Sequence, residues 1–214
     1  LHLSLRRQRQ MCIRDRVKID LFLRYGSIAA AGDRHLAEFC PGDWYLKDKE
    51  TVEKWGFALT PVLWRKGDLE KRLERSEKLY SGEEKFELKE TGEEGVQQIR
   101  ALLGLGDLVT NVNIPNYGQI PNLPIGAVVE TNACFRANSL NPVFAGNIPQ
   151  AIYPLISRVC GEQEQVVDCA LNRDLDGVFN AFAADPNMCI SVSDARKLFD
   201  EMVDNTKEYL KMYF

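Results

Sequence analysis

The stretch LVTNVNIPNYGQIPNLPIGAVVETNAC, residues 108–134, decides the fold class of this chain. β-branched residues alternate along residues 108–114, which is the pattern of a strand. Pro115, Pro121 and Pro124 then exclude a continuous helix or a central strand, so we expect an extended Asn-rich loop. A second strand is expected over residues 127–134.

Helical patterns surround these strands without the strand–helix alternation of a parallel sheet. Helices are expected over residues 17–25, 68–80, 94–103, 150–172, 175–184 and 194–212. Gly26 is expected to end the first helix and Ser193 to cap the last. Segment 44–64 is expected to be irregular, because Gly56 and Pro61 interrupt it. These patterns predict an α+β fold with helices packed against a mixed sheet.

The last predicted helix has the clearest period. Its apolar stripe consists of Ala195, Leu198, Phe199, Met202, Val203, Tyr209, Leu210 and Tyr213. Such a stripe is more typical of a protein core or a subunit interface than of a cofactor site.

A run of charged residues follows small ones in YGSIAAAGDRHLAEF, residues 25–39. Gly26 and Gly32 lack the Cβ that restricts φ, so we expect Asp33, Arg34 and His35 on a turn at the mouth of a cleft. The bland interpretation is equally strong on chemistry alone. Asp and Arg commonly begin helices, and a single His is more often a hydrogen-bonded structural residue than a catalyst.

Residues 1–16 differ from the rest of the chain. They carry five Arg against one Asp, show no apolar period, and are expected to be a non-native leader from a sequencing artefact. Without them the chain has 22 basic and 30 acidic residues, from totals of 27 and 31, a net charge of −8. An acidic body with no basic stripe argues against a nucleic-acid partner. No membrane span is predicted.

The six cysteines show no Cys-x-x-Cys spacing, so neither a zinc site nor a disulfide framework is expected. Cys160 and Cys169 are expected on helices as small buried side chains. This cysteine usage favours a cytoplasmic location.

The 25–39 run resembles the substrate loop of glycoside hydrolase family 4, in its α-galacturonidase-like branch. The block from Asn111 to Glu130 resembles that family's C-terminal signature, and the order of the two motifs matches. The resemblance runs from about Val17 to the C-terminus and includes residues 173–176 and 185–186.

This resemblance implies that residues 17–214 form a C-terminal substrate-binding and catalytic domain, with a fold like that of lactate and malate dehydrogenases. Gly-x-Gly-x-x-Gly is absent, so the Rossmann domain is expected to be missing. The family uses NAD and Mn²⁺ in an oxidation, elimination and addition sequence. Both cofactors are expected on the missing N-terminal part, with no metal ligand here. The isolated fragment is therefore expected to be inactive.

The resemblance also implies roles for individual residues. Asp33 is the expected base for the sugar C2 proton, with Tyr25 in reserve. Arg34 and His35 are expected to bind the sugar carboxylate or hydroxyls. For Glu38, orienting His35 and simple exposure are equal alternatives. Asn113 and Asn116 are further substrate-binding candidates, although Asn in such turns more often bonds its own backbone.

The expected function is therefore hydrolysis of a small-molecule α-galacturonide. An α-glucosidase or α-galactosidase of the same family is the alternative. Two other classes stay open: the C-terminal domain of a 2-hydroxy-acid dehydrogenase, and a non-catalytic binding module. The full-length protein is expected to be a homo-oligomer.

Overall fold

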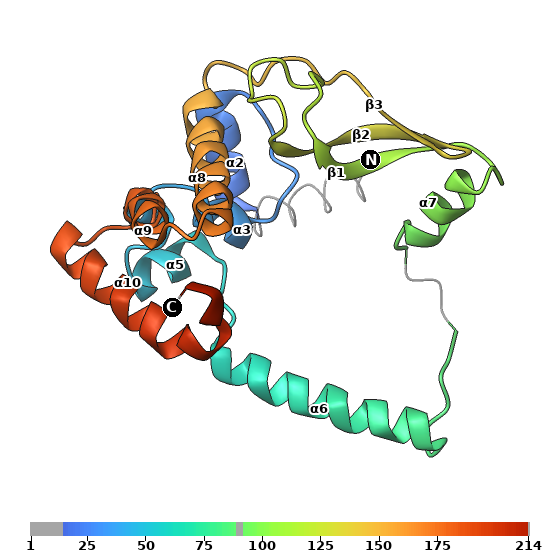
Figure 1. Ribbon diagram of the computed structural model, residues 1–214, viewed down its shortest axis with the longest axis horizontal. Helices are drawn as coiled ribbons and strands as arrows, with labels where there is room; N and C mark the ends of the chain where they lie inside the picture. The colour runs from blue at the N-terminus through green and yellow to red at the C-terminus, as the bar shows by residue number, and fades with distance from the viewer. Residues whose placement is uncertain (1–14, 89–91, 214) are drawn as a thin grey trace, which may run out of the picture. The chain divides into compact units, whose positions relative to one another are not determined.

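A computed structural model describes residues 15–88 and 92–213 (Figure 1). The chain divides into two compact units. Of the described residues, one unit holds 15–57, 113–129 and 144–213, and the other holds 58–88, 92–112 and 130–143. The helices of the first unit are α2 (Arg16–Tyr25), α3 (Asp33–Glu38), α4 (Gly42–Tyr45), α5 (Lys49–Trp55), α8 (Tyr153–Leu171), α9 (Leu175–Ala184) and α10 (Val192–Thr206), followed by short 3₁₀ turns η1 (Lys207–Tyr209) and η2 (Lys211–Tyr213).

The N-terminal helices share a small buried core. Val17, Ala37, Cys40 and Tyr45 are each no more than 3% exposed. The Tyr45 hydroxyl donates to Asp20 Oδ2 at 2.5 Å, and the Tyr45 ring meets Trp55 edge-on at 4.9 Å. This core fixes α2 against α3 and α4, because one residue of each helix lies in it.

Helices α8, α9 and α10 pack through apolar side chains, and α9 and α10 begin with side-chain caps. The Phe199 ring lies 5.5 Å from Phe179. Asp174 caps α9 by accepting from Gly177 N at 2.9 Å. Ser191, rather than the predicted Ser193, caps α10 by accepting from Asp194 N. The predicted cap lies two residues too late in the sequence. Ser193 directly precedes Asp194, but Ser191 has the extended backbone of an N-cap and Ser193 already lies inside the helix.

The second unit holds helices α6 (Val62–Ser81) and α7 (Gly95–Leu102) and most of a three-stranded sheet. The strands are β1 (Leu108–Pro115), β2 (Val128–Arg136) and β3 (Ser139–Pro142), in the order β1-β2-β3. β2 and β3 are antiparallel, with Ala133 opposite Pro142 and Arg136 opposite Ser139. β3 was not predicted, since four residues carry too little period to be recognised.

The segment 44–64, predicted to be irregular, contains the end of α4, all of α5 and the start of α6, so that prediction was wrong for most of its length. Asp48 accepts from Thr51 N at 2.8 Å and starts α5, while Gly56 ends it with φ of 76°. Pro61 lies at the N-cap of α6. The two residues interpreted as interruptions are helix boundaries, which is where Gly and Pro are best tolerated.

The α+β fold class is confirmed. The first expected helix, its Gly26 cap and the helix over 175–184 are also confirmed. Most of the expected leader, residues 1–14, lies outside the described residues. Arg16, which the sequence assigned to that leader, is the first residue of α2 and donates from Nη1 to Lys54 O at 2.7 Å.

The cysteines of the described residues form no disulfide bonds. Cys40, Cys134, Cys160, Cys169 and Cys189 are free thiols. Cys160 and Cys169 lie on α8, as predicted, but are only half-buried. Cys40 is 3% exposed, and desolvation raises the pKa of its thiol from 9.0 to about 11.

Replacing Cys40 with alanine should reduce the loss of stability at alkaline pH. Between pH 9.0 and about 11, the unfolded thiol ionises while the buried one keeps its proton, so stability falls as pH rises. Cys40→Ala has no thiol to ionise and should lose up to about 2 kcal/mol less over this range. Urea unfolding at several pH values measures the difference.

The matched control is Cys189→Ala, which removes an exposed thiol. This variant should follow the wild-type pH profile. Parallel pH profiles for wild type and Cys40→Ala would contradict the assignment to Cys40.

Candidate functional site

The predicted site begins where α2 ends and α3 begins. Gly26 ends α2 in the left-handed conformation, and the chain then runs through small residues to Gly32. Asp33, Arg34, His35 and Glu38 all lie on α3. The expectation that the charged trio lies on a turn was wrong, because Gly32 is the N-cap of α3 and its carbonyl accepts from Leu36 N at 3.1 Å.

Asp33 is buried, with 5% exposure. Its Oδ2 accepts from Val17 N at 3.2 Å and its Oδ1 accepts from Lys18 N at 3.0 Å. These two N–H groups belong to the first turn of α2, where a helix has no internal acceptors. Asp33 therefore caps α2 from a position 15 residues further along the chain.

His35 and Glu38 face solvent together on α3. His35 Nδ1 lies 3.5 Å from Glu38 Oε2, and the two side chains are 58% and 47% exposed. This is the contact expected if Glu38 orients His35. Arg34 is half-buried on the same helix, and Tyr25 is half-buried at the end of α2. The structure thus brings four of the predicted residues onto two turns of one helix.

Asn116 is fully buried and organises its own loop. Its Nδ2 donates to the carbonyl oxygens of Ile120, Leu123 and Pro124 at 2.9–3.1 Å. Its Oδ1 accepts from Gly118 N and Ile120 N, both at 3.1 Å. This matches the alternative in which the Asn bonds backbone of its own turn. Asn113, by contrast, is exposed on β1.

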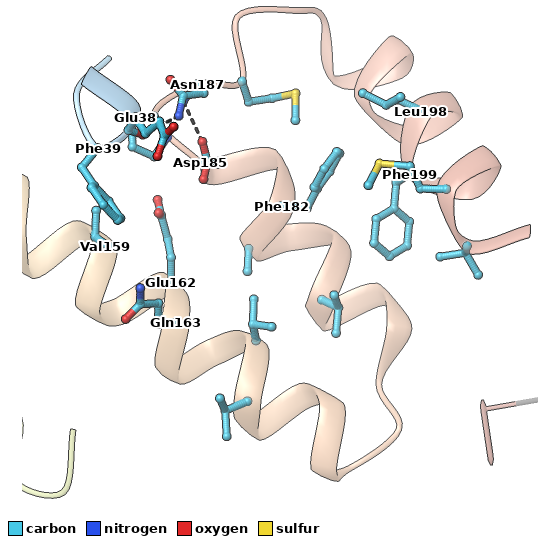
Figure 2. A pocket seen from close by; sticks show the side chains of 18 of the residues that line it. Glu38, Phe39, Val159, Glu162, Gln163, Phe182, Asp185, Asn187, Leu198 and Phe199 are labelled. Carbon is cyan, nitrogen blue, oxygen red and sulfur yellow. Dashed lines mark hydrogen bonds between the residues drawn. The ribbon is translucent and has the colours of Figure 1, made fainter. Parts of the chain in front are cut away.

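A groove that the sequence did not predict lies among α8, α9 and α10 (Figure 2). Its volume is about 1100 Å³. Figure 2 shows Phe182, Leu198 and Phe199 along one part, and the carboxylates of Glu38, Glu162 and Asp185 near the other end. The sequence feature that pointed toward this groove was the apolar stripe predicted on the last helix. Four of its residues line the groove: Leu198, Phe199, Met202 and Val203.

This groove is poorly suited to a sugar acid. Sugars are held by hydrogen bonds to polar side chains, whereas this lining is mostly apolar. Its carboxylates would also repel the carboxylate of a uronate. The charged residues of α3 are the better candidates, since Arg34 and His35 are basic.

The described residues contain no cluster of three or more His, Cys, Asp or Glu side chains that could hold a metal ion. The sequence also lacks the glycine fingerprint of a dinucleotide site. No helix in the described ranges is both long and apolar enough to span a membrane.

A family profile described as "Family 4 glycosyl hydrolase C-terminal domain" matches residues 4–188. An α-galacturonidase from Thermoanaerobacterium saccharolyticum is 65% identical over 196 residues, which are 92% of this chain and 42% of the relative. An α-galacturonidase from Thermoanaerobacter italicus is 50% identical over 92% of this chain and 44% of its own. The chain thus spans less than half the length of these relatives.

Solved structures agree with this relationship. The crystal structure of the Bacillus subtilis protein lplD matches with a TM-score of 0.81 at 49% identity, covering 87% of this chain and 42% of that one. A Thermotoga maritima 6-phospho-β-glucosidase, solved with manganese, NAD⁺ and glucose-6-phosphate, matches at 0.65 with 17% identity. That match covers 94% of this chain and 46% of the glucosidase. At this identity the second match shows the fold alone.

Asn116→Ala should destabilise the protein by about 3 kcal/mol, because several backbone groups of the buried loop would each lose a hydrogen bond to the Asn116 side chain. Urea-induced unfolding measures this loss. Asn113→Ala, at the exposed position three residues earlier, is the matched control and should stay within about 0.5 kcal/mol of wild type. If the two variants were equally stable, the Asn116 hydrogen bonds would not hold the loop.

Proposed function

The chain belongs to family 4 of the glycosyl hydrolases, and on that premise we propose that it forms the substrate-binding part of an α-galacturonidase. The observation that carries this proposal is the 65% identity with an α-galacturonidase over 92% of the chain. The substrate is then a small glycoside with a carboxylate on its sugar ring. We propose that the whole protein is cytoplasmic, in keeping with its free thiols.

The residues of α3 supply the chemistry for such a substrate. Arg34 is proposed to hold the sugar carboxylate, because a guanidinium forks onto a carboxylate with two hydrogen bonds. His35 is proposed to bind a neighbouring hydroxyl or the carboxylate, with Glu38 at 3.5 Å setting its ring orientation. The proximity of these side chains on one short helix supports the proposal.

Asp33 is proposed as the base that takes the C2 proton of the sugar. A carboxylate has about four acceptor sites on its two oxygens. Val17 N and Lys18 N occupy two of them, which leaves acceptor capacity on the same group. The two backbone donors would also hold the carboxylate in one orientation, as a positioned base requires. Tyr25 stays the reserve candidate.

NAD and Mn²⁺ are proposed as cofactors of the whole protein, bound mainly by parts outside this chain. The 6-phospho-β-glucosidase solved with both groups supports their use in proteins of this fold. The described part of the chain offers no three-residue cluster for the metal. We also propose that the leader, residues 1–16, contributes nothing to the site.

Arg34→Ala tests the substrate class. Residues 17–214 would be joined to the N-terminal part of the Thermoanaerobacterium relative and assayed with NAD and Mn²⁺. Loss of a charge-assisted bond should lower kcat/KM for an α-galacturonide by about tenfold to a hundredfold. A neutral α-galactoside, which lacks the carboxylate, should be affected much less.

Equal losses on both substrates would mean that Arg34 supports the fold and does not read the carboxylate. The 214-residue chain by itself is the second control. It should cleave neither substrate, even when both cofactors are added.

Asp33→Asn in the same joined protein tests the base. The amide keeps the size of the side chain but removes the basic oxygen, so kcat should fall by about 100-fold or more while substrate still binds. Solvent deuterium should no longer enter C2 of the sugar. The unfolding free energy should fall by about 1–2 kcal/mol, because an amide N–H would face a backbone N–H of α2.

A variant that is less stable but keeps normal turnover and C2 exchange would leave Asp33 with only its structural role. Tyr25→Phe is then the informative variant. If it abolished exchange, the base would be Tyr25.

A further inference from the structure

The loop between α9 and α10 contacts the end of α3. Asn187 Nδ2 donates to the backbone carbonyl of Glu38 at 2.6 Å, and Gly42 N donates to the carbonyl of Pro186 at 3.0 Å. Figure 2 marks the bonds of Asn187 to Glu38 and to Asp185. All of these residues belong to the first unit. The two hydrogen bonds tie the last residue of α3 and the first residue of α4 to one short loop.

The backbone of Asn187 is itself held in place. Its N–H donates to Asp185 Oδ1 at 2.7 Å, which is an Asx turn, and its carbonyl accepts from Cys189 N at 3.0 Å. The loop also packs closely against Gly42. A Cβ added to Gly42 would lie 3.0 Å from Cys189 Sγ and 3.4 Å from Asn187 Cα. The Asn187 amide therefore starts from a fixed position when it reaches the end of α3.

Helix α3 needs support at this end. It has six residues, and a helix of this length is not stable in water by itself. Glu38 is its last residue, and the carbonyls of the last turn have no donor within their own helix. Asn187 supplies a donor to the carbonyl of Glu38. The hydrogen bond thus fixes the backbone from which the Glu38 side chain projects.

Glu38 in turn faces His35, one helical turn earlier. His35 Nδ1 lies 3.5 Å from Glu38 Oε2. A neutral imidazole carries its proton on one of its two nitrogens, and a neighbouring acceptor decides which. A carboxylate at Nδ1 favours the proton there, so that Nε2 keeps its lone pair and can only accept a hydrogen bond. An ionised carboxylate is also an acceptor only, so Nε2 suits a hydroxyl and not a sugar carboxylate.

We propose that Asn187 is a positioning residue: it holds the last turn of α3 so that Glu38 keeps the proton of His35 on Nδ1. The inference rests on the proposed function, in which His35 binds the sugar. It gives His35 one role in that function, because Nε2 accepts from a sugar hydroxyl while Arg34 holds the carboxylate. Asn187 acts only through Glu38.

Nitrogen NMR of the imidazole in the 214-residue chain tests the positioning. The chain has two histidines, so a His2→Gln background leaves His35 as the single imidazole. At about pH 9, well above the ordinary pKa of histidine, the ¹⁵N shifts of the ring report which nitrogen carries the proton. His35 should be mainly protonated on Nδ1. Asn187→Ala should lower the ratio of the Nδ1–H to the Nε2–H form by about threefold to tenfold, the effect of one hydrogen bond.

The matched control is Asn172→Ala, at the end of α8. Asn172 is also exposed, and its Nδ2 donates to the carbonyl of Asp168 at 2.9 Å, so the same kind of bond is lost from another helix end. This variant should lose as much stability as Asn187→Ala but keep the wild-type proton ratio of His35. An unchanged ratio in Asn187→Ala, or an equal change in Asn172→Ala, would overturn the proposal.

Kinetics of the joined protein test whether Asn187 acts through Glu38. Asn187→Ala and Glu38→Ala should each lower kcat/KM for an α-galacturonide by about threefold to tenfold. A neutral α-galactoside should be affected equally, because the hydroxyls are common to both sugars. The double variant should be no worse than Glu38→Ala alone, since the two changes remove one contact. Additive losses would mean that Asn187 acts by another route, which would overturn the proposal.

The NMR measurement needs no activity, so it separates this inference from the proposed function. A changed proton ratio with unchanged kcat/KM would mean that His35 does not bind the sugar. The positioning of His35 by Asn187 would then stand, and the proposed role of His35 in substrate binding would be wrong.

Discussion

The carboxylate of Asp33 holds the N-terminal helices together. Val17 is fully buried through its side chain, and its backbone N–H is bonded to Asp33 Oδ2. One residue of α2 is thus fixed by apolar packing and by a hydrogen bond at the same time. Asp33 is also the first residue of α3. The side chain that caps α2 therefore also fixes where α3 begins. The positions of Arg34, His35 and Glu38 follow from that starting point.

Local patterns were sufficient for the elements whose signals are local. Helix α9 spans the predicted residues, and β1 and β2 lie within one or two residues of their predicted ends. The failure at 44–64 had a physical cause: Gly and Pro mark helix boundaries as often as they mark irregular chain. Only the Asp48 cap distinguishes the two cases, because it shows where a new helix begins.

The candidate site was predictable as a set of residues but not as a geometry. The sequence grouped Asp33, Arg34, His35 and Glu38, and α3 does carry them. The sequence could not show that the Asp33 side chain turns toward α2. The backbone N–H groups that bond to its carboxylate, those of Val17 and Lys18, lie 16 and 15 residues earlier in the chain. The backbone bonding of Asn116 was foreseen as the commoner role of an Asn in such a turn, but its partners became visible only in the folded loop. The apolar groove could not be predicted, because its lining comes from three helices that are separate in the sequence, α8, α9 and α10.

The first unit is built from three separate stretches of chain, and this affects its synthesis on the ribosome. Asn187 Nδ2 donates to the carbonyl of Glu38 across 149 residues, and Pro186 O accepts from Gly42 N. At translation rates of about 5–20 residues per second, α3 waits roughly 7–30 s for these partners. The second unit is translated completely by residue 143. A nascent chain therefore carries one unit that is complete in sequence while the core of the other unit still lacks its last helices.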